Sequence, residues 1–333
     1  MAAAAAGRCA VAPGGRAVLK AIRHRVEYWL VLITTAVARV LPWGIVRAMG
    51  TGLGWLFYAI DGRHRRVALQ NVADAFPHRS YADRRALVRG VFRHFGRVLF
   101  ELLKFSGLTP EQMLERVQVE GEDRQRAAHA AGRGVLFFTG HFGYWEIQAM
   151  AHGAAHNPIA VLARPLDNAR LHELLERMRT CTGNHVIYRR GALRRVLRAL
   201  GSNQGVALLI DQHIQPPDAV TISFFDRPAA TTLALAMLAM RTGAPVIPVF
   251  ALPISAGRYR LIYEPPVDPP REDTPEAIRD FTQRCTDVLE MYVRRHPELW
   301  LWMHRRWRDS DGLDAPGRGM FPEAGADRGP DES

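Results

Sequence analysis

Between about residues 116 and 263, short runs of β-forming residues alternate with stretches that have the character of helices. This alternation constrains the fold more than any other feature of the chain. Strands that alternate with helices are joined by crossover connections and pair mostly in parallel. The pattern therefore predicts an α/β domain with a mostly parallel central sheet over residues 116–308. The predicted strands cover residues 117–119, 135–139, 159–162, 186–188, 206–210, 246–251 and 259–263.

Helices are predicted on both sides of this alternating region. Apolar residues recur at about 3.6-residue intervals between residues 63 and 108, and a proline-containing turn divides that stretch into two helices. Residues 274–296 predict one amphipathic helix. The ends of the chain are expected to lack regular structure, residues 1–25 as a flexible basic lead and residues 309–333 as a disordered tail rich in Gly, Pro, Asp and Glu.

Residues 26–115 are predicted to form a helical region associated with a membrane. Its apolar stretches are interrupted by charged residues and a proline, so none is a clean span of about 20 apolar residues. Basic clusters lie on both sides, and a single span would carry one of them across the bilayer against the positive-inside tendency. We expect a helix in the membrane interface, or a weak anchor with both flanks cytoplasmic. A signal-peptidase site at Ala-Val-Ala, residues 36–38, is the alternative.

A histidine and a carboxylate stand five positions apart in Gly-His-Phe-Gly-Tyr-Trp-Glu, residues 140–146, directly after the predicted strand 135–139. On a regular helix, five steps would place His141 and Glu146 roughly 140° apart, so His141 must precede the helix if the two are to meet. The flanking glycines allow that bend. An imidazole held by a carboxylate on one ring nitrogen has a fixed tautomer, which suits a general base.

Such a pair is most often structural, but a polar pair between glycines and among apolar residues is costly without a purpose. The segment contains no serine or cysteine nucleophile. It therefore predicts the deprotonation of a substrate hydroxyl rather than a covalent enzyme intermediate.

The formal net charge of +11 favours anionic partners: a phospholipid surface, an acidic carrier protein or a phosphorylated glycolipid. Only Lys20 and Lys104 of the 44 lysines and arginines are lysine, which is typical of a GC-rich genome and by itself indicates no function. There is no helix-turn-helix, zinc-finger or RNA-binding signature, so no nucleic-acid partner is predicted.

The cysteines and histidines do not predict a disulfide framework or a metal site. Cys9, Cys181 and Cys285 are widely separated, which fits a reducing compartment. The histidines do not have metal-ligand spacing. We therefore predict neither a metal nor a cofactor.

Several blocks of sequence resemble the bacterial lipid A biosynthesis acyltransferases, the lauroyl and myristoyl transferases, and their relatives that acylate phosphatidylinositol mannosides. The resemblance runs from about residue 63 to residue 307, and the order of the blocks makes it specific. The blocks are Arg-Val-Ala-Leu-Gln-Asn (66–71), Ala-Phe-Pro (75–77), residues 140–146, Ala-Arg-Pro-Leu-Asp-Asn (163–168), Ala-Leu-Leu-Ile-Asp-Gln (207–212), Phe-Phe (224–225), Ala-Ala-Thr-Thr (229–232) and His-Pro-Glu-Leu-Trp-Leu-Trp-Met-His-Arg-Arg-Trp (296–307).

The resemblance implies a glycerolipid-acyltransferase-like α/β domain at the cytoplasmic face of the bacterial inner membrane. It implies transfer of a fatty acyl chain from an acyl-carrier-protein or acyl-CoA thioester to a glycolipid hydroxyl. His141 would be the general base, and Glu146 would orient it and stabilise the imidazolium. Backbone N–H groups at the start of the helix after Gly140 would supply some of the donors for the oxyanion.

Three further residues match positions beside the family's site. Arg164 and Arg179 would bind a substrate phosphate or the donor's phosphopantetheine, the alternative being solvated arginines. Asp211, at the end of a predicted strand, would be a second carboxylate near His141, or an acid that caps the next turn. The apolar helix predicted over residues 231–242 would form either a wall of the acyl groove or ordinary core.

Two features depart from the family. Asp226 and residues 233–234 stand where relatives often have glycine, and His213 stands where they often have a second acid. The stretch 300–307 suits either the membrane interface or the core beneath the site.

A lysophospholipid or a mannosylated glycolipid is an alternative acceptor. A non-catalytic basic membrane-binding protein is the alternative of a different class.

Overall fold

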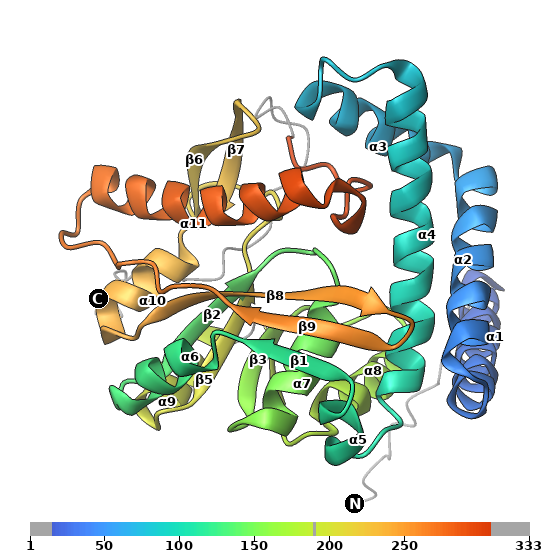
Figure 1. The fold of residues 1–333 in the computed structure, drawn as a ribbon, viewed down its shortest axis with the longest axis horizontal. Helices are drawn as coiled ribbons and strands as arrows, with labels where there is room; N and C mark the ends of the chain where they lie inside the picture. Colours follow the sequence, from blue (N-terminus) through green and yellow to red (C-terminus); the bar gives the residue numbers. More distant parts are fainter. Residues whose placement is uncertain (1–14, 189–190, 308–333) are drawn as a thin grey trace, which may run out of the picture.

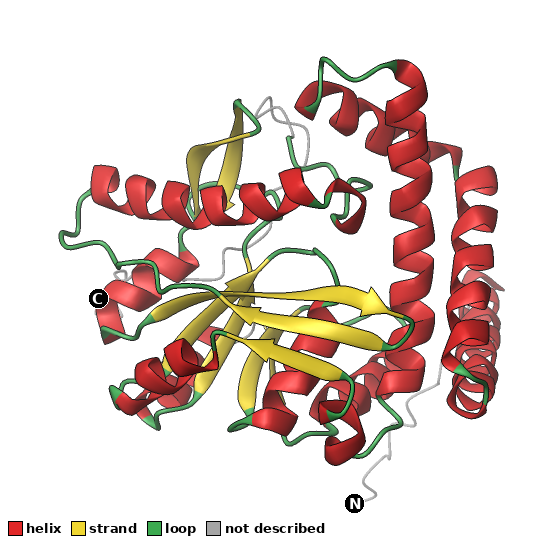
Figure 2. Ribbon diagram, in the orientation of Figure 1, coloured by secondary structure: helices red, strands yellow, loops and turns green. Residues whose placement is uncertain are grey.

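The computed structural model describes residues 15–188 and 191–307. The central sheet has seven strands: β1 (Val117–Glu120), β2 (Val135–Thr139), β3 (Ile159–Ala163), β4 (His185–Tyr188), β5 (Gly205–Leu209), β8 (Val246–Ser255) and β9 (Arg258–Tyr263). Their order across the sheet is β1-β9-β8-β2-β5-β3-β4. Figure 2 shows the strands in yellow, with helices around them in red. Strands β8, β2, β5, β3 and β4 are mutually parallel, whereas β9 is antiparallel to β8. The predicted α/β fold with a mostly parallel sheet is confirmed.

Eleven α-helices are described around this sheet and beside it (Figure 1). They are α1 (Gly15–Val40), α2 (Trp43–Ile60), α3 (Gly62–Ala75), α4 (Tyr81–Phe105), α5 (Pro110–Leu114), α6 (Glu122–Ala130), α7 (Trp145–Ala155), α8 (Ala169–Thr180), α9 (Ala192–Gly201), α10 (Ala234–Thr242) and α11 (Pro275–Arg295). Helices cover both faces of the sheet. Alternate side chains of each strand point to opposite faces, so each strand contributes to two cores. On one face, Phe137 and Val249 belong to the core with α6 and α7. On the other, Leu136 and Leu208 belong to the core with α9, α10 and α11.

The order of the strands brings three distant loops together. Strand β5 lies between β2 and β3, and all three run parallel. Their carboxyl ends therefore meet at one edge of the sheet, which is where open α/β sheets bind ligands. The chain reaches His141 just after β2, Arg164 just after β3 and Asp211 just after β5.

Helices α2 and α4 pack closely beside the sheet, on the side toward which the β8 arrow points in Figure 1. Glycines allow this approach. A Cβ atom built on Gly96 would lie 2.1 Å from the carbonyl oxygen of Gly50, and one on Gly54 would lie 2.3 Å from that of Phe92. Real Cβ atoms do not come so near a carbonyl oxygen, so the crossing depends on residues without side chains.

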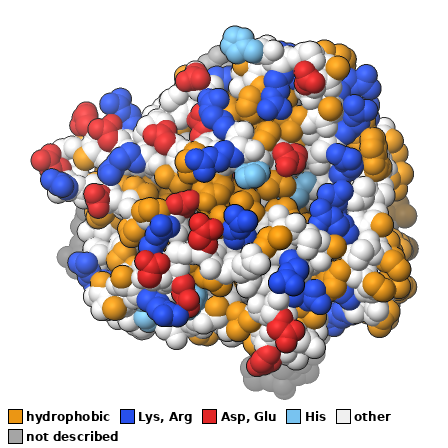
Figure 3. Space-filling view, in the orientation of Figure 1, with side chains coloured by type: hydrophobic (Ala, Val, Ile, Leu, Met, Phe, Trp, Pro, Cys, Tyr) orange, Lys and Arg blue, Asp and Glu red, His pale blue; other side chains and the backbone are white. Residues whose placement is uncertain are grey.

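No helix within the described residues has the length and apolar character needed to cross a membrane. Large apolar side chains are nonetheless exposed along α1 and α2, and Figure 3 shows hydrophobic side chains on the corresponding right-hand edge of the molecule. The exposed residues are Val18, Leu19, Ile22, Val26, Trp29, Leu30, Ile33, Val37 and Val40 on α1, and Ile45, Met49, Trp55, Leu56, Phe57 and Ile60 on α2.

The structure differs from the sequence predictions at two places. Residues 15–25, expected to belong to a flexible lead, form the start of α1, while residues 1–14 and the predicted tail 309–333 lie outside the described residues. Residues 219–232 form an unpredicted antiparallel hairpin, β6 (Ala219–Phe224) and β7 (Arg227–Thr232), so the helix predicted from residue 231 begins at Ala234.

The turn of this hairpin has an unusual backbone conformation. Phe225 and Asp226 join β6 to β7 with φ values of +54° and +57°. A two-residue hairpin of this kind requires positive φ at both positions. Glycine adopts that conformation most easily, and aspartate tolerates it better than most other residues. Asp226 can therefore adopt the conformation that this turn requires.

Candidate active site

His141 lies in the tight turn between β2 and α7, and two glycines shape that turn. A Cβ atom on Gly140 would lie 2.9 Å from Oδ2 of Asp211. Gly143 has a φ of +58°, and a Cβ atom there would lie 2.2 Å from the carbonyl oxygen of Ala251. The glycines thus allow the turn to approach Asp211 on one side and β8 on the other.

Asp211 fixes the position and the tautomer of His141. Its Oδ1 accepts a hydrogen bond from Nδ1 of His141 at 2.8 Å. Its Oδ2 accepts from the backbone N–H of His141 at 2.7 Å and from the indole N–H of Trp300 at 2.8 Å. Since Nδ1 carries the proton in this arrangement, the lone pair of the imidazole is on Nε2.

The charges of this pair stabilise one another. Burial alone would lower the pKa of His141, but the charge and hydrogen bond of Asp211, together with the charge of Glu146, outweigh burial and raise the pKa above its ordinary value. Burial alone would raise the pKa of Asp211, but His141 and the hydrogen bonds it donates hold that pKa below its usual range. The carboxylate is 1% exposed and remains ionised, so it can stabilise a proton gained by His141.

The pairing predicted between His141 and Glu146 is corrected by the structure, because the carboxylate on the imidazole is that of Asp211. Glu146 lies in the first turn of α7 and forms a bidentate ion pair with Arg179 of α8. The Nε–Oε2 distance is 2.9 Å and the Nη2–Oε1 distance is 2.5 Å. Glu146 acts on His141 only through its charge, which raises the histidine's pKa, while the charge of Arg179 lowers it.

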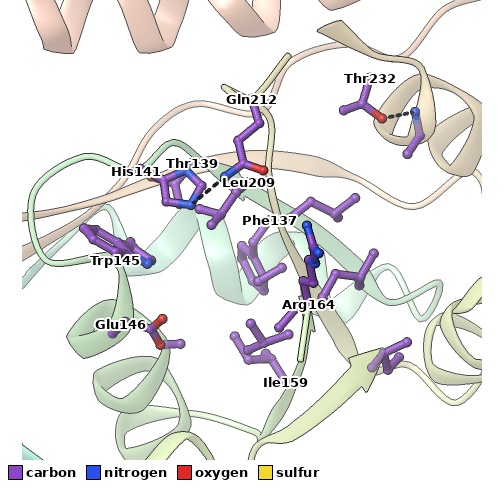
Figure 4. A pocket seen from close by; sticks show the side chains of 18 of the residues that line it. Phe137, Thr139, His141, Trp145, Glu146, Ile159, Arg164, Leu209, Gln212 and Thr232 are labelled. Atoms are coloured by element: carbon purple, nitrogen blue, oxygen red, sulfur yellow. Dashed lines mark hydrogen bonds between the residues drawn. The ribbon is translucent and has the colours of Figure 1, made fainter. Parts of the chain in front are cut away.

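A cavity of about 760 Å³ opens beside His141 and the Glu146–Arg179 ion pair (Figure 4). Its polar wall contains His141, Glu146, Arg164, Arg179 and Gln212. Its apolar wall extends along the sheet face that packs on α7, and residues on α9 and α10 complete it. The apolar part includes Phe137, Ala149, Ile159, Val161, Ile187, Ala207, Leu209, Ala234 and Val249.

All five residues predicted for the site therefore line the cavity or contact a residue that does. Arg164 is exposed at the end of β3, and Arg179 is half-buried in its pair with Glu146. Asp211 has the first of its two predicted roles, as a carboxylate beside His141. The amide Nε2 of Gln212 is 3.4 Å from Nε2 of His141, so Gln212 faces the nitrogen that carries the lone pair.

The C-terminal segment supplies residues whose roles sequence analysis did not assign. Trp300 and Trp302 are fully buried, which places the tryptophan-rich stretch in the core beneath the site. Nδ1 of His304 is 2.6 Å from the carbonyl oxygen of Leu301, and Nε2 is 3.0 Å from that of Asp211. Both nitrogens of His304 thus face carbonyl oxygens. In the sequence, only the position of His304 within the 296–307 block indicated a place near the site.

Arg306 is another residue of this segment that contacts the loop after β5. It is 1% exposed and donates hydrogen bonds to the carbonyl oxygens of Ala230 and Gln212 and to the hydroxyl of Thr231. Burial lowers its pKa to about 10, so the guanidinium remains charged near neutral pH. It holds the hairpin strand β7 against the loop that carries Asp211.

A family model described as bacterial lipid A biosynthesis acyltransferase matches residues 17–309 of this chain. The chain is 29% identical over 288 residues to the lipid A biosynthesis lauroyltransferase of Escherichia coli (strain K12), which covers 85% of this chain and 92% of the relative. It is 24% identical over 219 residues to a phosphatidylinositol mannoside acyltransferase of Mycobacterium tuberculosis. That match covers 65% of this chain and 67% of the relative. A solved structure, the 1-acyl-sn-glycerophosphate acyltransferase of Thermotoga maritima, is 15% identical in sequence and has a TM-score of 0.36. The match covers 76% of this chain and 97% of that structure.

Proposed function

Because the chain belongs to the family of bacterial lipid A biosynthesis acyltransferases and is therefore an O-acyltransferase, we propose that it transfers a fatty acyl chain from an acyl thioester to a hydroxyl group of a lipid A precursor. His141 is the general base and Asp211 holds it in place. One observation carries this proposal: a buried, ionised carboxylate fixes the proton on Nδ1 of a histidine that lines a large, mostly apolar cavity.

The reaction follows from the tautomer of His141. Nε2 takes the proton of the acceptor hydroxyl as its oxygen attacks the thioester carbonyl carbon. Asp211 stabilises the imidazolium that forms. The tetrahedral intermediate then collapses, the carbon–sulfur bond breaks, and the departing thiolate receives the proton from Nε2. Among the described residues that line the cavity there is no serine, cysteine or lysine, which supports direct transfer without an acyl-enzyme.

Three N–H groups of the turn that carries His141 already have acceptors within the protein. The N–H groups of His141, Gly143 and Tyr144 donate to Asp211, to the carbonyl of Leu299 and to that of Ala251, respectively. The first turn of α7 follows directly, and the first N–H groups of a helix have no partner within the helix. We propose that the backbone N–H groups of the first turn of α7 and the side-chain amide of Gln212 donate hydrogen bonds to the oxyanion.

The cavity suits the acyl donor. Its apolar wall takes the fatty acyl chain, since burial of each methylene group contributes about 0.8 kcal/mol. Arg164, exposed at the rim, binds a phosphate of the donor's phosphopantetheine or of the acceptor. Arg179 pairs with Glu146, so its role is to neutralise that carboxylate and shape the rim. The thioester is carried by an acyl carrier protein or by coenzyme A.

The exposed apolar side chains of α1 and α2 support association with the bacterial inner membrane at its cytoplasmic face. Basic side chains lie close to this apolar surface, and such a combination binds anionic lipid surfaces. The two helices would lie in the membrane interface. No helix of the described residues is long and apolar enough to cross a membrane. This would place the cavity next to a lipid acceptor.

Acyl transfer by the purified protein tests the proposal. The assay combines a lipid A precursor in mixed micelles with a dodecanoyl thioester of acyl carrier protein, or of coenzyme A, and follows the lipid by mass spectrometry. We expect a mass gain of one acyl chain on the lipid A precursor. A gain only on a lysophospholipid would replace the acceptor. Transfer to a phosphatidylinositol mannoside is the second candidate, favoured by the mycobacterial relative. No transfer to any of them would favour a non-catalytic membrane-binding protein.

Glu146→Gln and Arg179→Gln are expected to shift the pH dependence of acyl transfer in opposite directions. The base must be neutral, so kcat/KM falls as pH drops below the pKa of His141. Glu146 raises that pKa and Arg179 lowers it. Glu146→Gln should therefore move the acid limb to lower pH and Arg179→Gln should move it to higher pH.

The shifts are measured from pH–rate profiles and from the imidazole resonances of His141 by NMR. Glu173→Gln, an exposed glutamate on α8, is the matched control and should leave the profile in place. A shift of both variants in the same direction would show that they act by altering the shape of the site.

A further inference from the structure

A second cavity, of about 440 Å³, lies between α2, α4 and the C-terminal segment. Its lining is almost entirely apolar; the polar side chains are those of Asp61, His64 and His304. Apolar residues and glycines from the two helices form most of its wall, and Leu301 and Met303 complete it. The helical residues are Leu53, Gly54 and Phe57 on α2, and Phe92, Phe95, Gly96 and Leu99 on α4.

The side chains around this cavity leave it open to the surface. Phe57 is 46% exposed and Leu99 is 41% exposed, although both lie on helices that pack closely against each other. The glycine contacts bring the backbones together at the crossing, and the longer side chains project beside it. A lasting apolar opening of this kind is unfavourable in water unless an apolar ligand fills it.

One wall of the cavity adjoins the catalytic base. The N–H group of Leu301 donates a hydrogen bond to the carbonyl oxygen of His141 at 3.0 Å. The ring of His304, another wall residue, has its centroid 6.4 Å from that of His141. Phe95 packs on Trp145, which in turn packs on His141. The two cavities therefore lie on either side of the segment that carries the base.

Another wall adjoins the apolar surface. Helix α2 contributes Leu53 and Phe57 to the cavity, and the same helix exposes Trp55, Leu56 and Ile60. Phe57 belongs both to the cavity wall and to the exposed apolar side chains of α2, so the cavity adjoins this apolar surface directly. The first cavity has the charged residues Arg164, Arg179 and Glu146 in its wall, which suits a donor with a polar, phosphate-bearing arm.

We propose that the α2–α4 cavity binds an acyl chain that the acceptor lipid already carries, and so holds the acceptor with its free hydroxyl near Nε2 of His141. This inference rests on the proposed acyl transfer to a membrane lipid. It separates the two substrates: the donor chain occupies the cavity beside the sheet, and the acceptor chain occupies the cavity between the helices.

Leu99→Trp tests this separation by filling the α2–α4 cavity with a larger side chain. We expect KM for a lipid A precursor to rise about ten-fold, the effect of losing the burial of roughly two methylene groups, with kcat and KM for the acyl thioester unchanged. Leu114→Trp is the matched control, because Leu114 is 37% exposed on α5 and lines neither cavity. A rise in the thioester's KM instead would give the cavity to the donor chain, and unchanged constants would show that it binds no substrate. Either result overturns the proposal.

Photolabelling gives a readout that does not depend on catalysis. The probe is a lipid A precursor with a diazirine in one acyl chain, added to the wild-type protein in mixed micelles. Peptides that contain residues 53–57, 92–99 and 301–304 should be labelled, and unlabelled precursor should compete. Labelling there without any acyl transfer would overturn the proposed function but leave the cavity as a lipid site. Absence of label from these peptides would overturn the inference while transfer could still occur.

Discussion

His141→Ala is expected to lower kcat for acyl transfer by about 10³-fold or more, since a positioned general base typically contributes 10² to 10⁴. The variant removes the nitrogen that we propose accepts the hydroxyl proton, and it leaves the buried carboxylate of Asp211 without the partner that now donates to Oδ1. Single-turnover kinetics with a radiolabelled acyl thioester would measure the loss. Binding to anionic vesicles should be unchanged, because α1 and α2 are untouched.

His78→Ala is the control for loss of a histidine, because His78 is exposed in the turn between α3 and α4. It should retain wild-type rates. If His141→Ala keeps more than about a tenth of the wild-type kcat, proton abstraction by His141 cannot be the main contribution, and the mechanism proposed above would have to be abandoned.

Asp211→Asn is expected to reduce kcat by on the order of 10³-fold, although the side chain keeps its shape. Oδ2 of Asp211 faces two N–H donors, from Trp300 and the backbone of His141, whereas Oδ1 faces one. The asparagine will therefore place its oxygen toward the two donors and its NH₂ group toward Nδ1. Nδ1 must then accept, which moves the imidazole proton to Nε2 and removes the lone pair that acts as the base.

The pH profile distinguishes this effect from a structural defect. The Asp211 carboxylate raises the pKa of His141, so the residual activity of Asp211→Asn should have its acid limb at lower pH than wild type. Glu146→Gln is the comparison, because it removes a nearby charge and keeps the Asp211 contact. A normal rate in Asp211→Asn, with a cooperative thermal transition, would contradict the role given to Asp211.

The separate parts of the site were predictable, whereas their pairing was not. His141 stands out because glycines flank it after a buried strand, and Asp211 because it ends another strand. Their contact depends on β5 lying next to β2, and strand order is a property of the whole sheet. The nearer carboxylate in sequence, Glu146, was therefore paired with His141, but Arg179 on the neighbouring helix α8 engages it. The correction comes from tertiary contacts, which helical spacing does not describe.

The fold followed the same pattern. Strands buried on both faces were predicted, because such strands are continuous apolar runs. The hairpin of β6 and β7 was not, because its turn uses Phe225 and Asp226 at positive φ instead of the usual glycine. The tryptophan-rich stretch had a composition that suits both core and interface, and only its burial under Asp211 decided between them.

The contact between Trp300 and Asp211 affects the order in which a newly made chain acquires activity. Synthesis proceeds from the N-terminus, so the residues of the strands, of the histidine turn and of the cavity beside the sheet have all been added before residue 300. Until then, Asp211 lacks one of its three donors, and Leu301 and His304 do not yet support the turn and the loop on which His141 and Asp211 lie. We therefore expect the site to be completed only when the C-terminal segment has folded into place, and a chain that ends before that segment to lack acyl-transfer activity.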